Sequence, residues 1–198
     1  MRSVSCKCEN LIETDLPELI DLATRPETYE EIRHGSFQNL TCDRCGLNLK
    51  PELPVRLQDS VRGLDLQFLP EAERSDYLMG RIPVEAPRLA IGYRELAEKI
   101  RLLDAGLDDG AVEILKFFLK KKTGNDDAQI FFQEIRDGHL VFHIYGIRED
   151  EIALSRLPLP VYRDTLASLS SRSDRELYAV ILAPPYVSAN KVSIQEEE

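Results

Sequence analysis

Two pairs of closely spaced cysteines constrain the fold of this chain more than any other feature. The stretch "SCKC" contains Cys6 and Cys8, and the stretch "TCDRCG" contains Cys42 and Cys45. Close pairs of thiols are typical of metal sites, of disulfides and of redox centres. The chemistry of these four side chains therefore decides how the first part of the chain folds.

The second pair has the more specific pattern. In a zinc knuckle, C-x-x-C turns sharply so that both sulfur atoms face one ion. Gly46 follows Cys45, and a glycine suits such a turn because it adopts positive φ at little cost. In the first pair, C-K-C, residues i and i+2 of an extended strand point to the same side, so Cys6 and Cys8 can also reach one ion.

The four cysteines, Cys6, Cys8, Cys42 and Cys45, are therefore predicted to bind one structural zinc ion. Closing the loop between the two pairs costs conformational entropy, but this cost grows only logarithmically with loop length. A structural zinc supplies about 10–16 kcal/mol of apparent binding free energy in zinc-finger peptides, which outweighs that cost. Free thiols, buried or on the surface, and redox chemistry remain the alternatives.

Other side chains bear on the same site. Four thiolates around Zn²⁺ leave about −2 of formal charge, and Lys7 and Arg44 either offset part of it or are ordinary surface cations. His34 could replace one cysteine as a ligand, although its place beside Gly35 is typical of a turn residue. Because four cysteines fill a tetrahedral shell, a catalytic zinc with an open position is not expected.

The charge and the apolar content of the chain indicate which classes of partner and which cellular location to expect. The 198 residues include 35 acidic and 25 basic side chains, a formal net charge of −10, so the chain on average repels a polyanion. Nucleic acid is therefore not an expected partner, and the run Lys120–Lys122 suits the C-terminal end of a helix.

No apolar run approaches the length of about 20 residues that spans a bilayer, and the N-terminus lacks the apolar region of a signal peptide. We expect a cytoplasmic protein with reduced thiols and no membrane partner.

Residues 1–122 are predicted to form a zinc-ribbon-like antiparallel β-sheet with helices. Leu64, Leu66 and Phe68 alternate with polar residues, which is typical of a strand with one buried face. Pro51 and Pro54 indicate that the strand before it is broken or lies at an edge. Helices are predicted between Pro26 and Gly35, from Tyr93 to Gly106, and from the candidate N-cap Asp108 to Gly124.

A second unit is predicted from residue 123 to residue 198. The composition changes at "TGNDD", Thr123 to Asp127, where we place the boundary. Two strand-like runs flank Asp137-Gly138, a dipeptide typical of a hairpin turn, and "EIALSRLPLP" is a candidate third strand. The predicted fold class is therefore α+β, with a metal-binding domain at 1–122 and a small α+β domain at 123–198.

No catalytic signature is present in the sequence. The P-loop, dinucleotide-binding, nucleophile-elbow and H-E-x-x-H motifs are all absent. His139 and His143 lie about 13 Å apart along a strand, which is too far for both to bind one ion. Three tyrosines are expected to pack, with a pocket as the alternative: Tyr162, Tyr178 and Tyr186. No catalytic or cofactor-binding residue is predicted, and whether the chain is an enzyme stays open, with a non-enzymatic role favoured.

The sequence resembles the CpXC domain family over about Arg2 to Lys122. The resemblance rests on "VSCKC", on "HGSFQNLTCDRCGLNLKPELPVRLQD" and on "GLDLQFLP", and "ELAEKIRLLDAGLDDGAVEILKFFL" is similar to the helical continuation of such proteins. The family is named for a C-P-x-C motif, whereas this chain has C-K-C at the first pair and Asp43 in the place of proline at the second. The resemblance implies a zinc-bound fold piece with Cys42 and Cys45 as ligands, joined by the first cysteine pair, and it implies no activity.

These observations favour a zinc-stabilised binding module that contacts another protein of unknown identity. An enzyme or small-molecule binder with a pocket between the two domains is one alternative, and it calls for a deep pocket lined by Tyr and His. A nucleic-acid-binding zinc ribbon is the other alternative, and it calls for salt-dependent contacts with phosphates.

Overall fold

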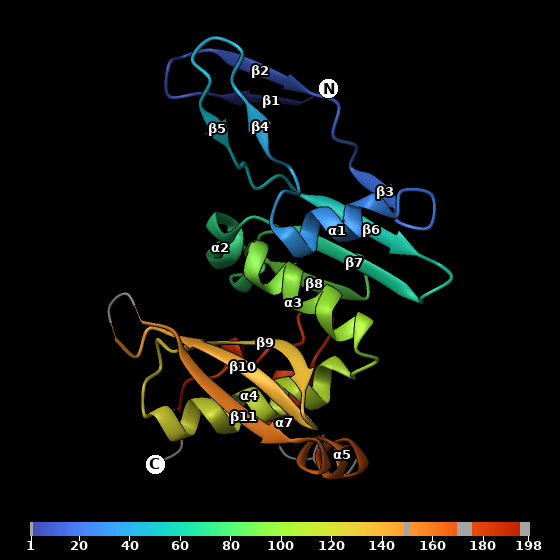
Figure 1. The fold of residues 1–198 in the computed structure, drawn as a ribbon, viewed down its shortest axis with the longest axis vertical. Helices are drawn as coiled ribbons and strands as arrows, with labels where there is room; N and C mark the ends of the chain where they lie inside the picture. The colour runs from blue at the N-terminus through green and yellow to red at the C-terminus, as the bar shows by residue number, and fades with distance from the viewer. Residues whose placement is uncertain (1, 149–150, 170–175, 195–198) are drawn as a thin grey trace. The chain divides into compact units, whose positions relative to one another are not determined.

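The computed structural model describes residues 2–148, 151–169 and 176–194, and the chain divides into two compact units, Met1–Ala97 and Glu98–Glu198 (Figure 1). Each unit combines helices with β-sheets. The α+β class predicted from the sequence is therefore confirmed. Among the described residues, no helix is both long enough and apolar enough to cross a membrane.

Two short hairpins in the first unit carry the cysteines. Strand β1 (Arg2–Ser5) pairs antiparallel with β2 (Leu11–Thr14), and β4 (Leu40–Thr41) pairs antiparallel with β5 (Asn48–Leu49). Figure 1 shows the two hairpins side by side. One cysteine pair lies in the turn of each hairpin. The two pairs of cysteines therefore occupy equivalent positions in their hairpins.

A four-stranded sheet forms the rest of the β-structure in this unit, in the order β3-β6-β7-β8. The central strands β6 (Val55–Asp59) and β7 (Leu64–Leu69) pair antiparallel, as the alternating pattern predicts. The outer strands β3 (Leu19–Asp21) and β8 (Arg88–Ile91) each join by a parallel pairing, so the sheet is mixed. Local sequence patterns do not reveal these parallel pairings, because each joins segments separated by a crossover connection.

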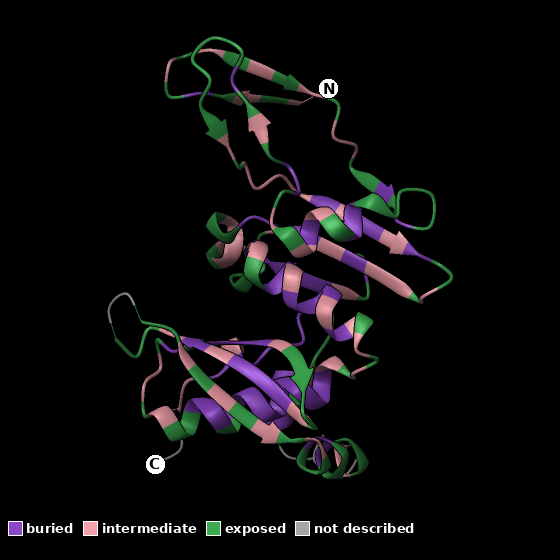
Figure 2. Cartoon of the chain, in the orientation of Figure 1, coloured by how far each residue is buried: buried purple, intermediate pink, exposed green. Residues whose placement is uncertain are grey.

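Burial alternates along the central strands, as Figure 2 shows. Along β6, Val55 and Leu57 are buried, whereas Arg56 and Gln58 are half-buried. Leu66, the partner of Leu57 on β7, is buried as well. One face of the sheet therefore contributes to the core, and the other face carries polar side chains that remain partly accessible.

Helix α1 (Glu27–His34) agrees with its predicted limits. Pro26 stands at its N-cap, and Gly35 ends it with a φ of 71°. The backbone N–H of Gly35 donates to the carbonyl of Ile32 at 3.2 Å, which a residue with positive φ makes possible. The break predicted at Pro51 and Pro54 is also present, since β5 and β6 are separate strands on either side of them. Two short helical elements follow β7: η1 (Glu71–Glu73) and α2 (Arg74–Leu78).

The second unit contains a three-stranded antiparallel sheet in the order β11-β10-β9. Strands β9 (Gln129–Arg136) and β10 (His139–Tyr145) form the predicted hairpin, and the turn residues Asp137 and Gly138 have φ values of 50° and 72°. The candidate third strand is present as β11 (Ala153–Pro158). The described helices are α3 (Gly92–Asp104), which spans the division between the units, α4 (Asp109–Thr123), α5 (Leu159–Ala167), α7 (Glu176–Leu182) and the short η2 (Ala189–Lys191).

Helix α4 supplies much of the core of this unit. Its predicted N-cap, Asp108, accepts a hydrogen bond from the backbone N–H of Ala111 at 2.8 Å. One apolar cluster joins α3, α4, the three-stranded sheet and α5: Leu102, Ala111, Val112, Leu115, Leu119, Ala128, Ile130, Phe132, Leu140, Phe142, Ile144 and Tyr162. Because α4 packs with the C-terminal sheet, the compact units divide between Ala97 and Glu98 rather than at residues 122–123. The division into compact units does not test whether residues 123–198 fold by themselves.

Candidate metal centre

The four cysteine sulfur atoms converge at the turns of the two hairpins, and all four Sγ atoms lie within 4.8 Å of one another. The Sγ atoms of Cys6 and Cys45 lie 3.6 Å apart, and those of Cys8 and Cys42 lie 3.7 Å apart. Thiolates at about 2.3 Å from a tetrahedral zinc ion lie about 3.8 Å from one another, so these separations fit a single four-coordinate ion. All four cysteines are free thiols. We call this group the cysteine cluster.

The second knuckle, residues 42–47, has the geometry that its sequence predicts. Gly46 has a φ of 71°, and its backbone N–H donates to the carbonyl of Cys42 at 2.8 Å. The N–H of Cys42 in turn donates to the carbonyl of Leu47 at 2.9 Å. These two backbone bonds close a tight loop with Cys42 at its start and Cys45 just before the glycine. The role predicted for Gly46 is therefore confirmed.

The first knuckle, residues 6–10, brings its cysteines together in a different way from the predicted one. Strand β1 ends at Ser5, so Cys6 and Cys8 lie in a turn and not on an extended strand. Cys6 donates its N–H to the carbonyl of Asn10 at 2.8 Å, and Glu9 donates its N–H to the carbonyl of Cys6 at 2.9 Å. Glu9 has a φ of 66° and thus takes the left-handed conformation that glycine has in the second knuckle.

Burial and hydrogen bonds set the pKa values of the thiols. The pKa of Cys42 is lowered to about 6: burial opposes this shift, but hydrogen bonds from the backbone of Cys45 and Arg44 favour the thiolate more strongly. The pKa of Cys8 is raised to about 12, because burial and the neighbouring thiols outweigh the effect of the Asn10 backbone, which lowers it. Of these two thiols, Cys42 therefore ionises at the lower pH. A bound cation is what allows all four sulfur atoms to carry charge together at neutral pH.

Two polar side chains link the hairpins beside the cluster. The guanidinium of Arg44 donates to the carbonyl oxygen of Cys8 at 3.2 Å, while Lys7 is exposed. The side-chain nitrogen Nδ2 of Asn10 lies 3.6 Å from Sγ of Cys42. Asn10 was not predicted as a site residue, because this contact spans 32 positions and no short motif reveals it.

His34, the alternative ligand, lies elsewhere in the first unit. It is the last residue of α1, it is exposed, and its Nδ1 lies 3.7 Å from a carboxylate oxygen of Glu30. Within the described ranges, the group of side chains that could hold a metal ion consists of the four cysteines. The structure therefore brings the four predicted ligands together and leaves His34 out.

The histidines and tyrosines of the second unit that the sequence singled out lie in turns, in strands or in the packed interior. His139 shares a 2.8 Å hydrogen bond with the carbonyl of Asp137 in the hairpin turn. Burial, together with the charge of Arg101, lowers the pKa of His143. The hydroxyl of Tyr162 accepts a hydrogen bond from the backbone N–H of Asp108 at 2.9 Å. Tyr162, Tyr178 and Tyr186 are all buried, as expected for residues that pack.

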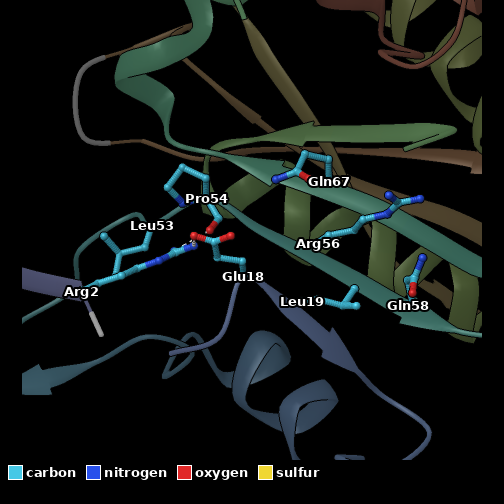
Figure 3. Close-up of a pocket in the computed structure, with 8 residues that line it drawn as sticks. All are labelled: Arg2, Glu18, Leu19, Leu53, Pro54, Arg56, Gln58 and Gln67. Atoms are coloured by element: carbon cyan, nitrogen blue, oxygen red, sulfur yellow. Dashed lines mark hydrogen bonds and ion pairs between the residues drawn. The ribbon is translucent and has the colours of Figure 1, made fainter. Parts of the chain in front are cut away.

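A groove of about 590 Å³ lies on the partly accessible face of the four-stranded sheet (Figure 3). Arg2 donates to the carbonyl of Pro54 at 2.6 Å and lies 3.6 Å from Glu18, and Arg56 forms a bidentate pair with Asp65 at 2.7 Å for both bonds. Both guanidinium groups are therefore engaged within the protein. The lining residues are Arg2, Glu18, Leu19, Leu53, Pro54, Arg56, Gln58 and Gln67.

Comparison with known proteins agrees with the geometry of the cluster. Residues 4–116 match the family described as CpXC protein, which is more than half of the chain and includes all four cysteines. A protein of Treponema pallidum (strain Nichols), described as "Uncharacterized protein", is 24% identical over 216 residues, which cover 97% of this chain and 98% of that protein. No solved structure shows a significant match. The chain therefore belongs to the CpXC family, and its cysteine cluster is compatible with metal binding.

Proposed function

We propose that the cysteine cluster binds one structural zinc ion, and that the hairpins ordered by this ion form a binding module for another protein. The observation that carries the proposal is the convergence of four Sγ atoms within 4.8 Å, drawn from two hairpins that are distant in sequence. Apolar packing of the two turns without a metal ion would not require four thiols at one point. Four thiols at tetrahedral spacing are the donor set that zinc prefers for structural sites.

The number of ligands supports a structural role for the ion. A catalytic zinc generally keeps three protein ligands and one open position for water or substrate. The cysteine cluster offers four sulfur atoms, which fill a tetrahedral shell. An ion held in this way stabilises the two turns and leaves no position at which a substrate could bind to it.

The exposed side chains of the hairpins support a contact with another protein. Leu11 follows the first knuckle and is 64% exposed, and Leu47 closes the second knuckle and is 38% exposed. Leu11 pairs with Ser5 in the first hairpin, and the backbone carbonyl of Leu47 accepts a hydrogen bond from the N–H of Cys42. The backbone of each leucine is therefore held beside a knuckle. A metal ion that fixes the turns therefore also fixes two apolar side chains that a partner could cover.

The experiment compares the metal-loaded full-length chain with the Leu11→Ser/Leu47→Ser variant in cross-linking from the native lysate. The proposal expects one identified partner to be recovered with the wild-type chain and reduced at least about tenfold with this variant, at equal zinc content. Val61→Ser is the matched control, because Val61 is 85% exposed and lies in the turn between β6 and β7. Equal recovery with all three proteins would exclude the hairpins as the binding surface.

A further inference from the structure

Asn10 is hydrogen-bonded to two of the four cysteines. Its backbone carbonyl accepts from the N–H of Cys6 at 2.8 Å. Its side-chain Nδ2 lies 3.6 Å from Sγ of Cys42, a distance expected for an N–H that donates to a sulfur atom. The first bond belongs to the first knuckle, and the second reaches the second knuckle. Asn10 therefore connects both halves of the cysteine cluster.

Asp43 fixes the orientation of this amide. The Nδ2 atom of Asn10 lies 2.6 Å from Oδ1 of Asp43, and an amide nitrogen carries two hydrogen atoms, so it can donate to Asp43 and to Cys42 together. Asp43 stands at the position where the motif that names the family has proline. A proline could not accept this bond with its side chain. In this chain the departure from the motif thus supplies the group that holds Asn10 against Cys42.

We propose that Asn10 is a positioning residue for the metal ion: its amide donates to the sulfur of Cys42 and keeps the two knuckles at the separation that one ion requires. The inference rests on the proposed metal binding and adds the residue that tunes it. A hydrogen bond from an uncharged amide stabilises a metal-bound thiolate and orients its lone pairs. Outer contacts of this kind typically change metal affinity by about 10- to 100-fold.

The test measures zinc affinity in the full-length chain by competition with a chromophoric chelator. Asn10→Asp is nearly isosteric, but it removes the N–H donor and places a carboxylate beside Asp43 and the sulfur of Cys42. The dissociation constant for zinc is expected to be about 10- to 100-fold higher than that of the wild-type chain. Asn10→Ala removes the donor without adding charge and should weaken binding by a smaller factor. Asn39→Ala is the matched control, because Asn39 is an exposed asparagine outside the knuckles.

Cobalt substitution separates a positioning role from a merely structural one. The sulfur-to-cobalt charge-transfer band reports the charge on the bound thiolates, so loss of the amide donor should shift this band in both Asn10 variants at saturating Co²⁺. Asp43→Asn keeps the amide of Asn10 but weakens its anchor, and its effect should be smaller and less than additive with that of Asn10→Ala.

The outcomes distinguish this inference from the proposed function. A wild-type chain that binds neither zinc nor cobalt would contradict the metal site itself. A wild-type chain that binds zinc, with unchanged affinity and an unchanged cobalt spectrum in Asn10→Ala, would overturn only the role of Asn10. If Asn10→Asp does not fold, the Asn10→Ala and Asp43→Asn variants decide the matter, since neither introduces a charge.

Discussion

The Sγ atoms of Cys6 and Cys45 lie 3.6 Å apart although 39 positions separate the two residues in the sequence. Cys8 and Cys42 form a similar contact, also from one hairpin to the other. The cysteine cluster therefore joins the hairpins to each other, in addition to closing the turn of each. Each hairpin has strands of at most four residues, and hairpins of this size are marginal in water without further support.

Replacement of a buried cysteine of the cluster should unfold both hairpins at once. Cys42→Ser removes the sulfur that contacts Cys8 and Asn10, so we expect loss of bound metal and loss of amide protection in β1, β2, β4 and β5. Hydrogen exchange read by mass spectrometry measures this segment by segment, and β9 to β11 should keep wild-type protection. Ser3→Ala, an exposed change on β1, serves as the control. Unchanged exchange in the hairpins of Cys42→Ser would contradict a structural role for the cluster.

Asp59 should make the stability of the first unit depend on pH. Its buried carboxylate accepts from the hydroxyl of Tyr29 at 2.8 Å and from the backbone N–H groups of Val61 and Arg62 at 2.9 and 3.0 Å. Burial opposes ionisation, but these hydrogen bonds outweigh it and hold the pKa of Asp59 below the usual value of 3.8. The contribution of Asp59 is therefore present above that value and is lost as the pH falls through the lower pKa of the folded state.

Urea unfolding of Asp59→Asn measures this contribution. At pH 7 the variant should be less stable by about 1–3 kcal/mol, because buried donors lose a charged acceptor. At pH 3, below the usual pKa of an aspartate, the difference should shrink, since the unfolded wild-type chain then takes up a proton at Asp59. A difference of the same size at both pH values would mean that the ionised state of Asp59 does not matter.

Lys116 should be required for the stability of the second unit. Its ammonium is buried and lies 2.7 Å from Glu98 and 2.9 Å from Glu113. Burial works against the charge, but the two carboxylates more than compensate and raise the pKa of Lys116. Lys116→Met leaves the buried carboxylate of Glu98 without its cation and leaves Glu113 to the ammonium of Lys99, 3.8 Å away, so the expected loss is about 3–5 kcal/mol.

A second substitution should recover part of that loss. Glu98→Gln in the Lys116→Met background removes one unpaired charge, while the amide oxygen can still accept from the N–H of Phe132, which lies 2.6 Å from the Glu98 carboxylate. Lys122→Met, an exposed change in the same helix, should stay within about 0.5 kcal/mol of wild type. Equal stabilities of Lys116→Met and Lys122→Met in chemical denaturation would show that the buried network contributes little.

Two fragments test where the second unit begins. A fragment of residues 98–198 includes α4 and should give a dispersed amide spectrum by NMR, because the apolar cluster around α4 is complete. A fragment of residues 123–198 lacks α4 and should remain unfolded, since its three-stranded sheet loses the helix against which it packs. A dispersed spectrum from the shorter fragment would restore the boundary that the sequence composition suggests.

The features predicted correctly are those encoded by neighbouring residues. Asp108 caps α4, Asp137-Gly138 forms a hairpin turn, and Gly46 takes a positive φ, because each depends on the conformational preferences of one or two residues. The convergence of the cysteines was also predictable, since thiol spacing reports a metal-binding pattern.

The features that were missed depend on contacts between distant segments. The parallel pairing of β3 with β6 leaves no local pattern, and neither does the packing of α4 on the C-terminal sheet. The C-K-C spacing predicts two side chains on one side of an extended strand, whereas the observed turn depends on a positive φ at Glu9, a residue type that does not normally signal one. Asn10 was overlooked because its partners, Cys42 and Asp43, lie more than 30 positions away.

Native mass spectrometry of the full-length chain, purified without added metal, tests the central claim most directly. The account predicts a mass that exceeds the apo mass by one zinc ion per chain, and four thiols that resist alkylation until a chelator or acid removes the ion. A native mass equal to that of the apo chain, with all four cysteines alkylated at once under native conditions, would contradict it.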